Sequence, residues 1–255
     1  MDDNGDLKQW SLQNFKLVND YPMAENYWIY SMAITPDSKW LFTCDFDGNL
    51  KQFNIRDQTL YKDFKKLHEG YIYDLVISPD GKYLFTGGKD QNLKQWSILE
   101  EKLYKDCGKL VQDGFAIFSM IVSPDSKSLF LVDDLGSLKQ WSISEQKEIT
   151  DFVGGKVHNS AIRCLSVTPD SRYLFTTDSK CWIKKWDLLK KKMEKDYQRV
   201  HEEWIVSNVV SPDGKTMFCG GKDGTLKERL VENQKLIKNY QKPHKGGIMC
   251  MVIGS

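Results

Sequence analysis

Four histidines are the side chains in this 255-residue chain best suited to bind a metal or to transfer a proton. They are His68, His158, His201 and His244. They return with the period of a repeating sequence pattern, and a side chain that recurs once per repeat is more typical of a structural element than of a single reaction centre. The sequence therefore predicts structural roles for these histidines and no metal site.

Short motifs that mark enzymes do not occur in the sequence. It contains no G-x-S-x-G nucleophile motif, no P-loop, no H-E-x-x-H zinc motif and no dinucleotide-binding glycine fingerprint. The glycine pairs Gly87-Gly88 and Gly220-Gly221 share one position of the repeat, and most aspartates lie in turn-like segments. We therefore expect no catalytic residue, no bound cofactor and no small-molecule substrate.

The repeat is clearest at one position, usually an aromatic residue, that ends a Leu-Lys-Gln-type tripeptide. This position is occupied by Trp10, Phe53, Trp96, Trp141, Trp186 and Arg229. The steps between them are 43, 43, 45, 45 and 43 residues. A nearly fixed period of this length indicates stacked copies of one supersecondary unit, so the fold follows from the repeat.

A Pro-Asp pair followed by Ser or Gly is the second marker of the repeat. It begins at Pro36, Pro79, Pro124, Pro169 and Pro212, in each case 17 residues before the aromatic position. These residue types favour a tight turn. An apolar stretch precedes the turn, and two adjacent apolar residues such as Leu84-Phe85 follow it, which predicts a strand buried on both faces. Each repeat is therefore predicted to hold four short antiparallel strands, a to d, with a polar outer strand d.

This combination of period, turn and strand order resembles the WD-repeat family of β-propellers, over nearly all of the chain. The dipeptide that names the family occurs as Trp186-Asp187. The resemblance implies an all-β propeller of four-stranded antiparallel blades in one domain, residues 1–255. Five complete blades are expected at about 27–66, 70–109, 115–154, 160–199 and 203–240, and a sixth is expected to be split between 244–255 and 3–19.

The split blade is expected to lack strand b, because the two ends together supply seven residues fewer than the other repeats between their markers. Three interpretations remain open. The chain is a piece of a longer array, such as one of seven blades; or the ring closes with a three-stranded blade; or a partner donates the missing strand by β-augmentation.

In the WD-repeat family, a histidine, a strand-b Ser or Thr, a turn aspartate and the tryptophan form a hydrogen-bonded tetrad. The resemblance implies one complete structural tetrad in this chain: His68, Thr86, Asp90 and Trp96. A second set, His158, Thr176 and Trp186, is expected to lack its aspartate because Lys180 occupies that position. In the set around His201, Cys219 and Arg229 replace the hydroxyl and the tryptophan.

Propellers of this family bind partners through loops at the faces of the ring, and the resemblance places six residues on the rim of the channel. These candidate partner-binding residues are Trp28, Tyr71, Trp204, Phe46, Lys89 and Lys222. Exposed aromatic rings beside cations are typical of protein interfaces. The alternative interpretation is that the tryptophans pack on the neighbouring blade.

Composition argues against nucleic-acid and membrane partners. The lysines at 184–185, 190–192 and 195 form a basic stretch, but acidic residues interrupt it and the formal net charge is only +1. A solvated blade edge explains this stretch better than a nucleic-acid site does. The apolar runs are too short to cross a membrane, and the first residues lack the apolar core of a signal peptide.

Six cysteines without a C-x-x-C arrangement predict reduced thiols inside a cell, in the cytoplasm or alternatively in the nucleus. The sequence as a whole predicts a non-catalytic scaffold that binds other proteins or peptides, as a monomer or through a strand-completing association. One alternative is a regulatory propeller module of a larger enzyme, such as a protein kinase. Another is a propeller enzyme with a site in the central channel, which would need convergent carboxylates or histidines that break the repeat.

Overall fold

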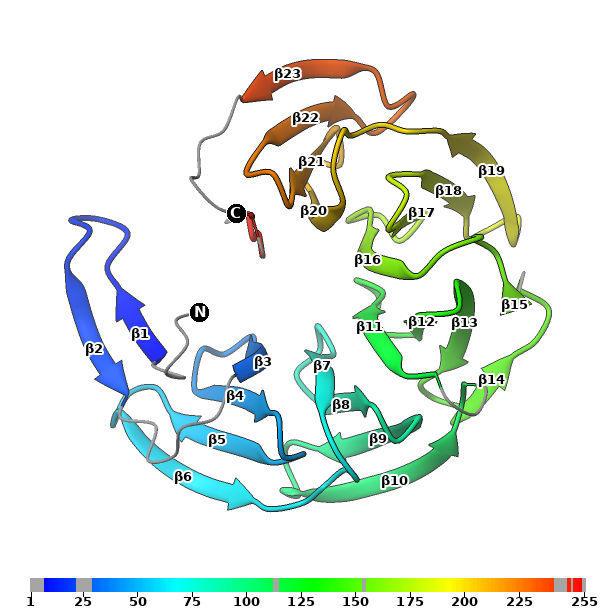
Figure 1. Ribbon diagram of the computed structural model, residues 1–255. Coiled ribbons are helices and arrows are strands. Elements are labelled where there is room, and N and C mark those ends of the chain that lie inside the picture. Colours follow the sequence, from blue (N-terminus) through cyan, green and yellow to red (C-terminus); the bar gives the residue numbers. More distant parts are fainter. Residues whose placement is uncertain are drawn as a thin grey trace. The chain divides into compact units, whose positions relative to one another are not determined.

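The chain folds into β-strands (Figure 1). The computed structural model describes residues 7–21, 29–111, 115–152, 155–240, 247–248 and 250–253. Within these residues the strands form six antiparallel sheets, and five of them have four or more strands. The prediction of an all-β chain built from four-stranded antiparallel sheets is confirmed. No helix that could cross a membrane occurs in this part of the chain.

The strands fall into two compact units, and unit 1 comprises residues 1–117. Its first sheet is the hairpin of β1 (Leu7–Trp10) and β2 (Leu17–Tyr21). The second sheet contains β3 (Ile29–Ile34), β4 (Trp40–Asp45), β5 (Leu50–Asn54) and β6 (Thr59–Phe64). The third contains β7 (Ile72–Ile77), β8 (Tyr83–Gly88), β9 (Asn92–Ser97) and β10 (Lys102–Lys109).

Unit 2 comprises residues 118–255, and its first strand begins at the boundary. Its first sheet contains β11 (Ile117–Val122), β12 (Ser128–Asp133), β13 (Ser137–Ser142), β14 (Lys147–Ile149) and β15 (Gly155–Lys156), which also pairs with β13. The second sheet contains β16 (Ile162–Val167), β17 (Tyr173–Asp178), β18 (Ile183–Asp187) and β19 (Lys192–Tyr197). The third contains β20 (Ile205–Val210), β21 (Thr216–Gly221), β22 (Leu226–Leu230) and β23 (Leu236–Tyr240).

Each Pro-Asp marker is the turn between the first two strands of a sheet. In the turn before β8, the Ser78 hydroxyl donates to Asp80 Oδ1 at 2.6 Å, and the same oxygen accepts the backbone N–H of Lys82 at 3.1 Å. Gly81, between Asp80 and Lys82, has a φ of 71°, a left-handed conformation that glycine adopts without strain. A Ser or Thr precedes the proline in all five copies, so the hydroxyl belongs to the turn as much as the Pro-Asp pair does.

Burial follows the predicted strand roles. The second strand of each four-stranded sheet is buried on both faces; in β8, Leu84, Phe85 and Thr86 are all at most 1% exposed. The fourth strand faces solvent, and in β19 the first four residues are exposed. The sequence prediction of a doubly buried strand b and a polar outer strand d is confirmed for the described sheets.

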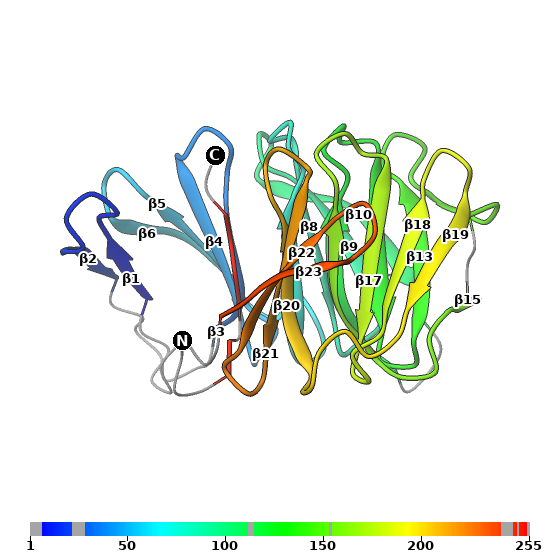
Figure 2. The same cartoon turned by 90° about the horizontal axis from the view of Figure 1, so that it is seen from above.

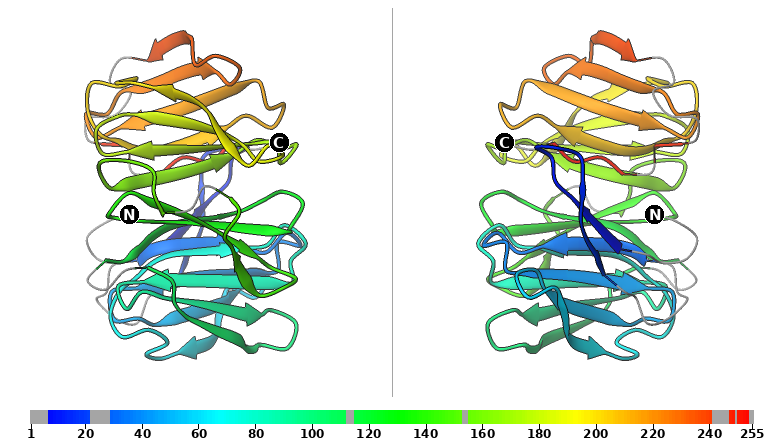
Figure 3. Two further views of the ribbon diagram at one scale, coloured as in Figure 1. Left: turned by 90° about the vertical axis from the view of Figure 1, so that its right-hand side faces the viewer. Right: turned by 90° about the vertical axis from the view of Figure 1, so that its left-hand side faces the viewer.

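The hydrophobic core lies between consecutive sheets within each unit. In unit 1, one cluster joins Phe42 and Leu50 of the β3–β6 sheet to Ile72, Leu84 and Trp96 of the β7–β10 sheet. In unit 2, another joins Phe175 of β17 to Met217 and Cys219 of β21. Figure 2 and Figure 3 show the successive sheets of a unit stacked face against face. Each sheet therefore depends on its neighbour for burial.

The predicted split blade is only partly visible in the described residues. Its expected strands c and d occur as β1 and β2. Of the expected strand a, residues 247–248 and 250–253 are described and form no strand; instead the backbone N–H of Ile248 donates to Gly221 O at 3.0 Å, and that of Met251 to Ser207 Oγ at 3.0 Å. The closure of this blade and the assignment of the chain to one domain both stay predictions.

Candidate partner-binding surface

A backbone hydrogen bond joins two of the candidate rim residues in each unit. Lys89, in the turn after β8, donates its N–H to the carbonyl of Tyr71 at 2.9 Å. In unit 2, Lys222, in the turn after β21, donates to the carbonyl of Trp204 at 2.8 Å. The same bond therefore brings an aromatic residue before strand a next to a lysine in the turn between strands b and c, once in each unit.

Unit 1 carries an aromatic cluster built on this bond. The ring of Phe46, which is 37% exposed, lies 3.8 Å from the ring of Tyr71, centroid to centroid. Tyr30 of β3 stacks on Tyr71 at 6.1 Å, and Tyr73 of β7 meets the Tyr71 ring edge-on at 5.8 Å. The ammonium group of Lys89 lies 4.9 Å from the Tyr71 ring centre, within the range of a cation–π contact.

Unit 2 carries a second cluster, of two cations and two aromatic rings, which we call the unit 2 cluster: Phe118, Arg163, Trp204 and Lys222. The Arg163 guanidinium lies 4.5 Å from the ring centre of Phe118 and 5.8 Å from that of Trp204. Lys222 Nζ lies 4.8 Å from the Trp204 ring, which is 45% exposed. An exposed indole with two cations on it can receive both apolar and anionic groups of a partner.

Five of the six candidate rim residues thus form two groups, one in each unit. Phe46, Tyr71 and Lys89 come together in unit 1, and Trp204 and Lys222 in unit 2. Trp28 lies outside the described residues. That these residues bind a partner stays a prediction.

Sequence reasoning missed four members of these clusters: Tyr30, Tyr73, Phe118 and Arg163. Each is the second residue of strand a, the first strand of its sheet. The rim position lies two residues earlier, and side chains two apart on a strand share a face. The period-two rule could therefore have found them, had the apolar stretch before each turn not been interpreted as core alone.

The predicted structural tetrad forms one hydrogen-bonded chain of side chains. His68 is 3% exposed; its Nδ1 lies 2.8 Å from Asp90 Oδ1 and its Nε2 lies 2.8 Å from Thr86 Oγ1. Trp96 Nε1 donates to the same hydroxyl at 3.2 Å. Burial raises the pKa of Asp90, but the hydrogen bond and charge of His68, with two backbone N–H groups, outweigh burial and lower the pKa to about 2.

The expectation that the His158 set lacks a carboxylate is wrong. Asp178, the last residue of β17, supplies it: its Oδ2 lies 3.1 Å from His158 Nδ1, while His158 Nε2 lies 2.7 Å from Thr176 Oγ1. Trp186 Nε1 completes the chain by donating to Thr176 at 3.0 Å. The other oxygen of Asp178 accepts the backbone N–H groups of Lys180 and Trp182. The carboxylate comes from the strand end rather than from the turn position of Lys180.

The His201 set is incomplete. His201 Nε2 lies 3.0 Å from Thr225 Oγ1, and Nδ1 is buried with no hydrogen-bond partner in the described residues. Burial first, and then the charge of Lys227, lower the pKa of His201. Arg229, which replaces the tryptophan, donates from Nη1 to Gln234 O at 2.8 Å and from Nη2 to Val200 O. His244 lies outside the described residues.

No group of three or more histidine, cysteine or acidic side chains is arranged to hold a metal ion in the described part of the chain. All six cysteines are free thiols. Cys44, Cys164, Cys181 and Cys219 are buried, whereas Cys250 is exposed. Burial raises the pKa of Cys107 to about 11 and that of Cys219 to about 12, so these thiols are poor nucleophiles at neutral pH.

Four of the six lysines of the basic stretch on β18 and β19 form ion pairs with acidic residues. Lys184 pairs with Asp196 at 3.4 Å and Lys190 with Asp187 at 3.4 Å, while Lys191 pairs with Asp151. Lys185 differs from the expected solvated edge: it is 5% exposed and its Nζ lies 3.1 Å from Glu194. These four pairs reduce the free positive charge that a nucleic acid would require.

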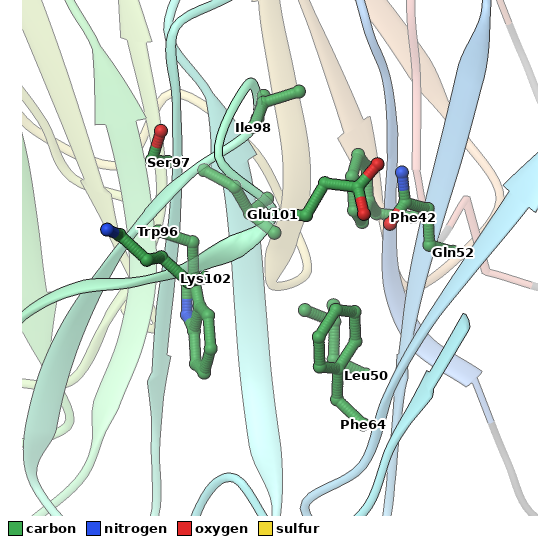
Figure 4. A pocket seen from close by; sticks show the side chains of 10 residues that line it. Phe42, Leu50, Gln52, Phe64, Trp96, Ser97, Ile98, Glu101 and Lys102 are labelled. Atoms are coloured by element: carbon green, nitrogen blue, oxygen red, sulfur yellow. The ribbon is translucent and has the colours of Figure 1, made fainter. Parts of the chain in front are cut away.

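Two hollows lie within the units. The one in Figure 4 lies between the β3–β6 and β7–β10 sheets, is lined by Phe42, Phe64 and Trp96, and holds about 10 Å³, room for about one water molecule. A groove of about 530 Å³ in unit 2 is lined by Tyr173 and Lys185 of one sheet and by Pro212 and Leu230 of the next. Charges of both signs line this groove, so it has no clear ligand preference.

Comparison with known proteins agrees with this architecture. The family model described as "WD domain, G-beta repeat" matches residues 16–54, 61–97, 151–187 and 195–227, which together exceed half of the chain. A search of curated proteins finds no match. Four separate repeat matches, together with the four-stranded antiparallel sheets, show that this chain belongs to the WD-repeat family.

Proposed function

We propose that this chain is a non-catalytic scaffold that binds other proteins inside the cell. WD-repeat proteins generally act as protein-binding scaffolds, and this membership supports the coarse assignment. The free cysteines are those expected of a protein kept in a reducing compartment, which supports a cytoplasmic location. We expect the chain to bind as a monomer or through an association that completes a sheet.

The observation that carries this proposal is the exposed aromatic cluster of unit 1. Phe46 lies on Tyr71, with Lys89 against the same ring. The Tyr71 ring already packs against Tyr30, Phe46 and Tyr73, so little side-chain entropy is lost there when a partner binds. Exposed aromatic rings of this kind are the anchors that dominate binding energy at protein interfaces.

The experiment is affinity purification of the full chain from cells, followed by quantitative mass spectrometry. Phe46→Ala/Lys89→Ala removes one exposed ring and one cation from the cluster. Leu99→Ala/Lys82→Ala is the matched control, because it removes an apolar side chain that is 91% exposed and a lysine whose side chain is 70% exposed elsewhere in unit 1.

We expect the cluster variant to recover its partner proteins at least about tenfold less well than wild type, since loss of a hot-spot residue costs about 2 kcal/mol or more and about 1.4 kcal/mol is tenfold in affinity. The control should recover them at the wild-type level. Identical partner lists for all three proteins would refute the assignment of this surface. Fluorescence microscopy of the tagged chain tests the cytoplasmic location.

A further inference from the structure

The two cations of the unit 2 cluster have no carboxylate partner among the residues that the structure describes. Neither Arg163 nor Lys222 forms an ion pair within the described residues, whereas four of the six lysines of the basic stretch do. The neighbouring Asp223 is occupied, because its Oδ1 accepts the Thr225 hydroxyl at 2.7 Å and the Thr225 N–H at 3.0 Å. Glu203, next to Trp204 in the chain, makes no ion pair in the described residues. Arg163 and Lys222 are therefore two cations without a direct ion pair within the described residues.

Arg163 also has an unsatisfied donor. Its Nε is buried and makes no hydrogen bond within the described residues. A buried N–H without an acceptor costs free energy until an acceptor is supplied. The rings of Phe118 and Trp204 lie near the guanidinium, whose N–H groups point outward in its own plane, the direction from which a guanidinium meets an acceptor.

The backbone holds these groups in one place. Arg163 lies on β16 and Trp204 immediately precedes β20, and these two strands pack side by side (Figure 1). The hydrogen bond from the backbone N–H of Lys222 to the backbone carbonyl of Trp204 holds these two residues side by side. Because the cations are already positioned, an anionic partner meets a site that needs little rearrangement.

We infer that the unit 2 cluster binds an acidic segment of a partner protein, with a carboxylate on the edge of Arg163 and a second one near Lys222. This inference rests on the proposed scaffold function and names the chemistry of the partner. A guanidinium edge matches the two oxygens of a carboxylate, and the exposed indole covers the apolar part of the same segment. Extended nucleic acid fits less well, because four lysines of the basic stretch on β18 and β19 are already paired with acidic residues.

The test is fluorescence anisotropy with the full chain and a fluorescein-labelled dodecapeptide of alternating Glu and Ser. A peptide with Gln in place of every Glu is the ligand control. Arg163→Gln/Lys222→Gln removes the two free charges. Lys190→Gln/Lys191→Gln is the matched protein control, because it removes the same net charge from two lysines that are already paired in the same unit.

We expect the Glu peptide to bind wild type and the Lys190/Lys191 variant equally, and to bind the Arg163/Lys222 variant at least about tenfold more weakly. The Gln peptide should not bind. Arg163→Lys keeps the charge and loses the planar fork, so its affinity should lie between those of wild type and the double variant. Circular dichroism verifies that each variant is folded; where the double variant is not, Arg163→Lys and Trp204→Ala decide the comparison.

Equal weakening in both double variants would mean that only net charge matters and would overturn the inference. Tighter binding of a uridine dodecanucleotide through the same residues would also overturn it, in favour of a nucleic-acid site. Absence of Glu-peptide binding, with partner recovery in cells still dependent on Phe46 and Lys89, would refute the acidic segment and leave the scaffold function standing.

Discussion

Two histidines at corresponding points of the repeat, His68 and His158, differ in the carboxylate that holds them. His68 uses Asp90, four residues after the strand-b threonine, whereas His158 uses Asp178, two residues after it. In the first case the strand ends in Gly88, and a Cβ there would lie 2.1 Å from the carbonyl oxygen of Tyr71. Because no side chain fits at the end of β8, the turn residue Asp90 supplies the carboxylate to His68. In the other repeat, Asp178 at the end of β17 supplies it to His158.

The low pKa of Asp90 predicts a pH-dependent stability difference between wild type and Asp90→Asn. At pH 7 the substitution should lower the free energy of unfolding by about 1–3 kcal/mol, because His68 loses its charged acceptor. A carboxyl whose pKa is lower in the folded than in the unfolded protein stabilises above the unfolded value and ceases to do so as it protonates. The difference should therefore shrink as the pH falls from about 4 towards 2.

Urea denaturation of both proteins at pH 7 and at several pH values below 4 measures this difference. Glu100→Gln serves as the control, since Glu100 is half exposed and its surface pair with Lys102 is worth little. A difference that stays constant down to pH 2 would contradict the assigned role of Asp90.

Asp178 and Lys180 give a second test at the scale of single residues. Asp178→Ala should lower the free energy of unfolding by about 1–3 kcal/mol, because His158 and two backbone N–H groups lose their acceptor. Lys180→Ala should change it by less than about 0.5 kcal/mol, as expected for an exposed side chain. Thermal denaturation compares the stability of the two variants. An equal loss of stability in both would contradict the assignment of Asp178 as the acceptor for His158.

Position counting in the sequence could find the His68 tetrad but not the one around His158. The threonine and the tryptophan are fixed because the strands that carry them are buried and cannot shift register, and each histidine precedes its threonine by 18 residues. The aspartate is different, since an aspartate at the end of strand b or one in the following turn can bind the histidine ring nitrogen. Likewise Arg163 and Phe118 were missed because a residue within an apolar stretch gives no sign of which face it occupies until the sheet is known.

At the scale of elements, the β1–β2 hairpin is the least protected sheet. Trp10 is 55% exposed, whereas Trp96, Trp141 and Trp186 are at most 8% exposed at the corresponding position. Leu12 and Phe15, in the turn of the hairpin, are 87% and 80% exposed. Two strands alone bury too little apolar surface to be stable in water. The sequence predicted the position of these strands but not the exposure of the marker tryptophan.

This contrast predicts the effect of removing the marker tryptophan from two different sheets. Trp186→Ala should lower the free energy of unfolding by about 3–5 kcal/mol, as for other buried aromatic residues, while Trp10→Ala should cost far less. Native-state hydrogen exchange should also be faster in β1 and β2 than in β8 and β17. Equal protection of all four strands would show that the hairpin has a partner on its open edge.

At the scale of the whole molecule, stability is shared between neighbouring sheets within each unit. Phe175 belongs to β17, yet its cluster includes Met217 and Cys219 of the next sheet. Such coupling between nearest neighbours is the way repeat proteins hold together. The prediction of a single domain remains to be tested by calorimetry, where a single domain unfolds with equal calorimetric and van't Hoff enthalpies.

Phe175→Ala should therefore affect two sheets at once. We expect a loss of about 3–5 kcal/mol in the free energy of unfolding, with faster hydrogen exchange in β21 as well as in β17. Leu189→Ala, at a position that is 77% exposed, should leave both unchanged. Faster exchange confined to β17 would contradict the sharing of the core.

The buried cysteines can report the local opening of the sheets that contain them. Cys44 lies in unit 1 and Cys219 in unit 2, both about 1% exposed, and burial raises the pKa of each. A maleimide added to the native protein should label the exposed Cys250 within minutes and reach the buried cysteines only when their sheets open. Peptide mapping of the label over time would then give a separate opening rate for each unit, with no residue introduced or replaced.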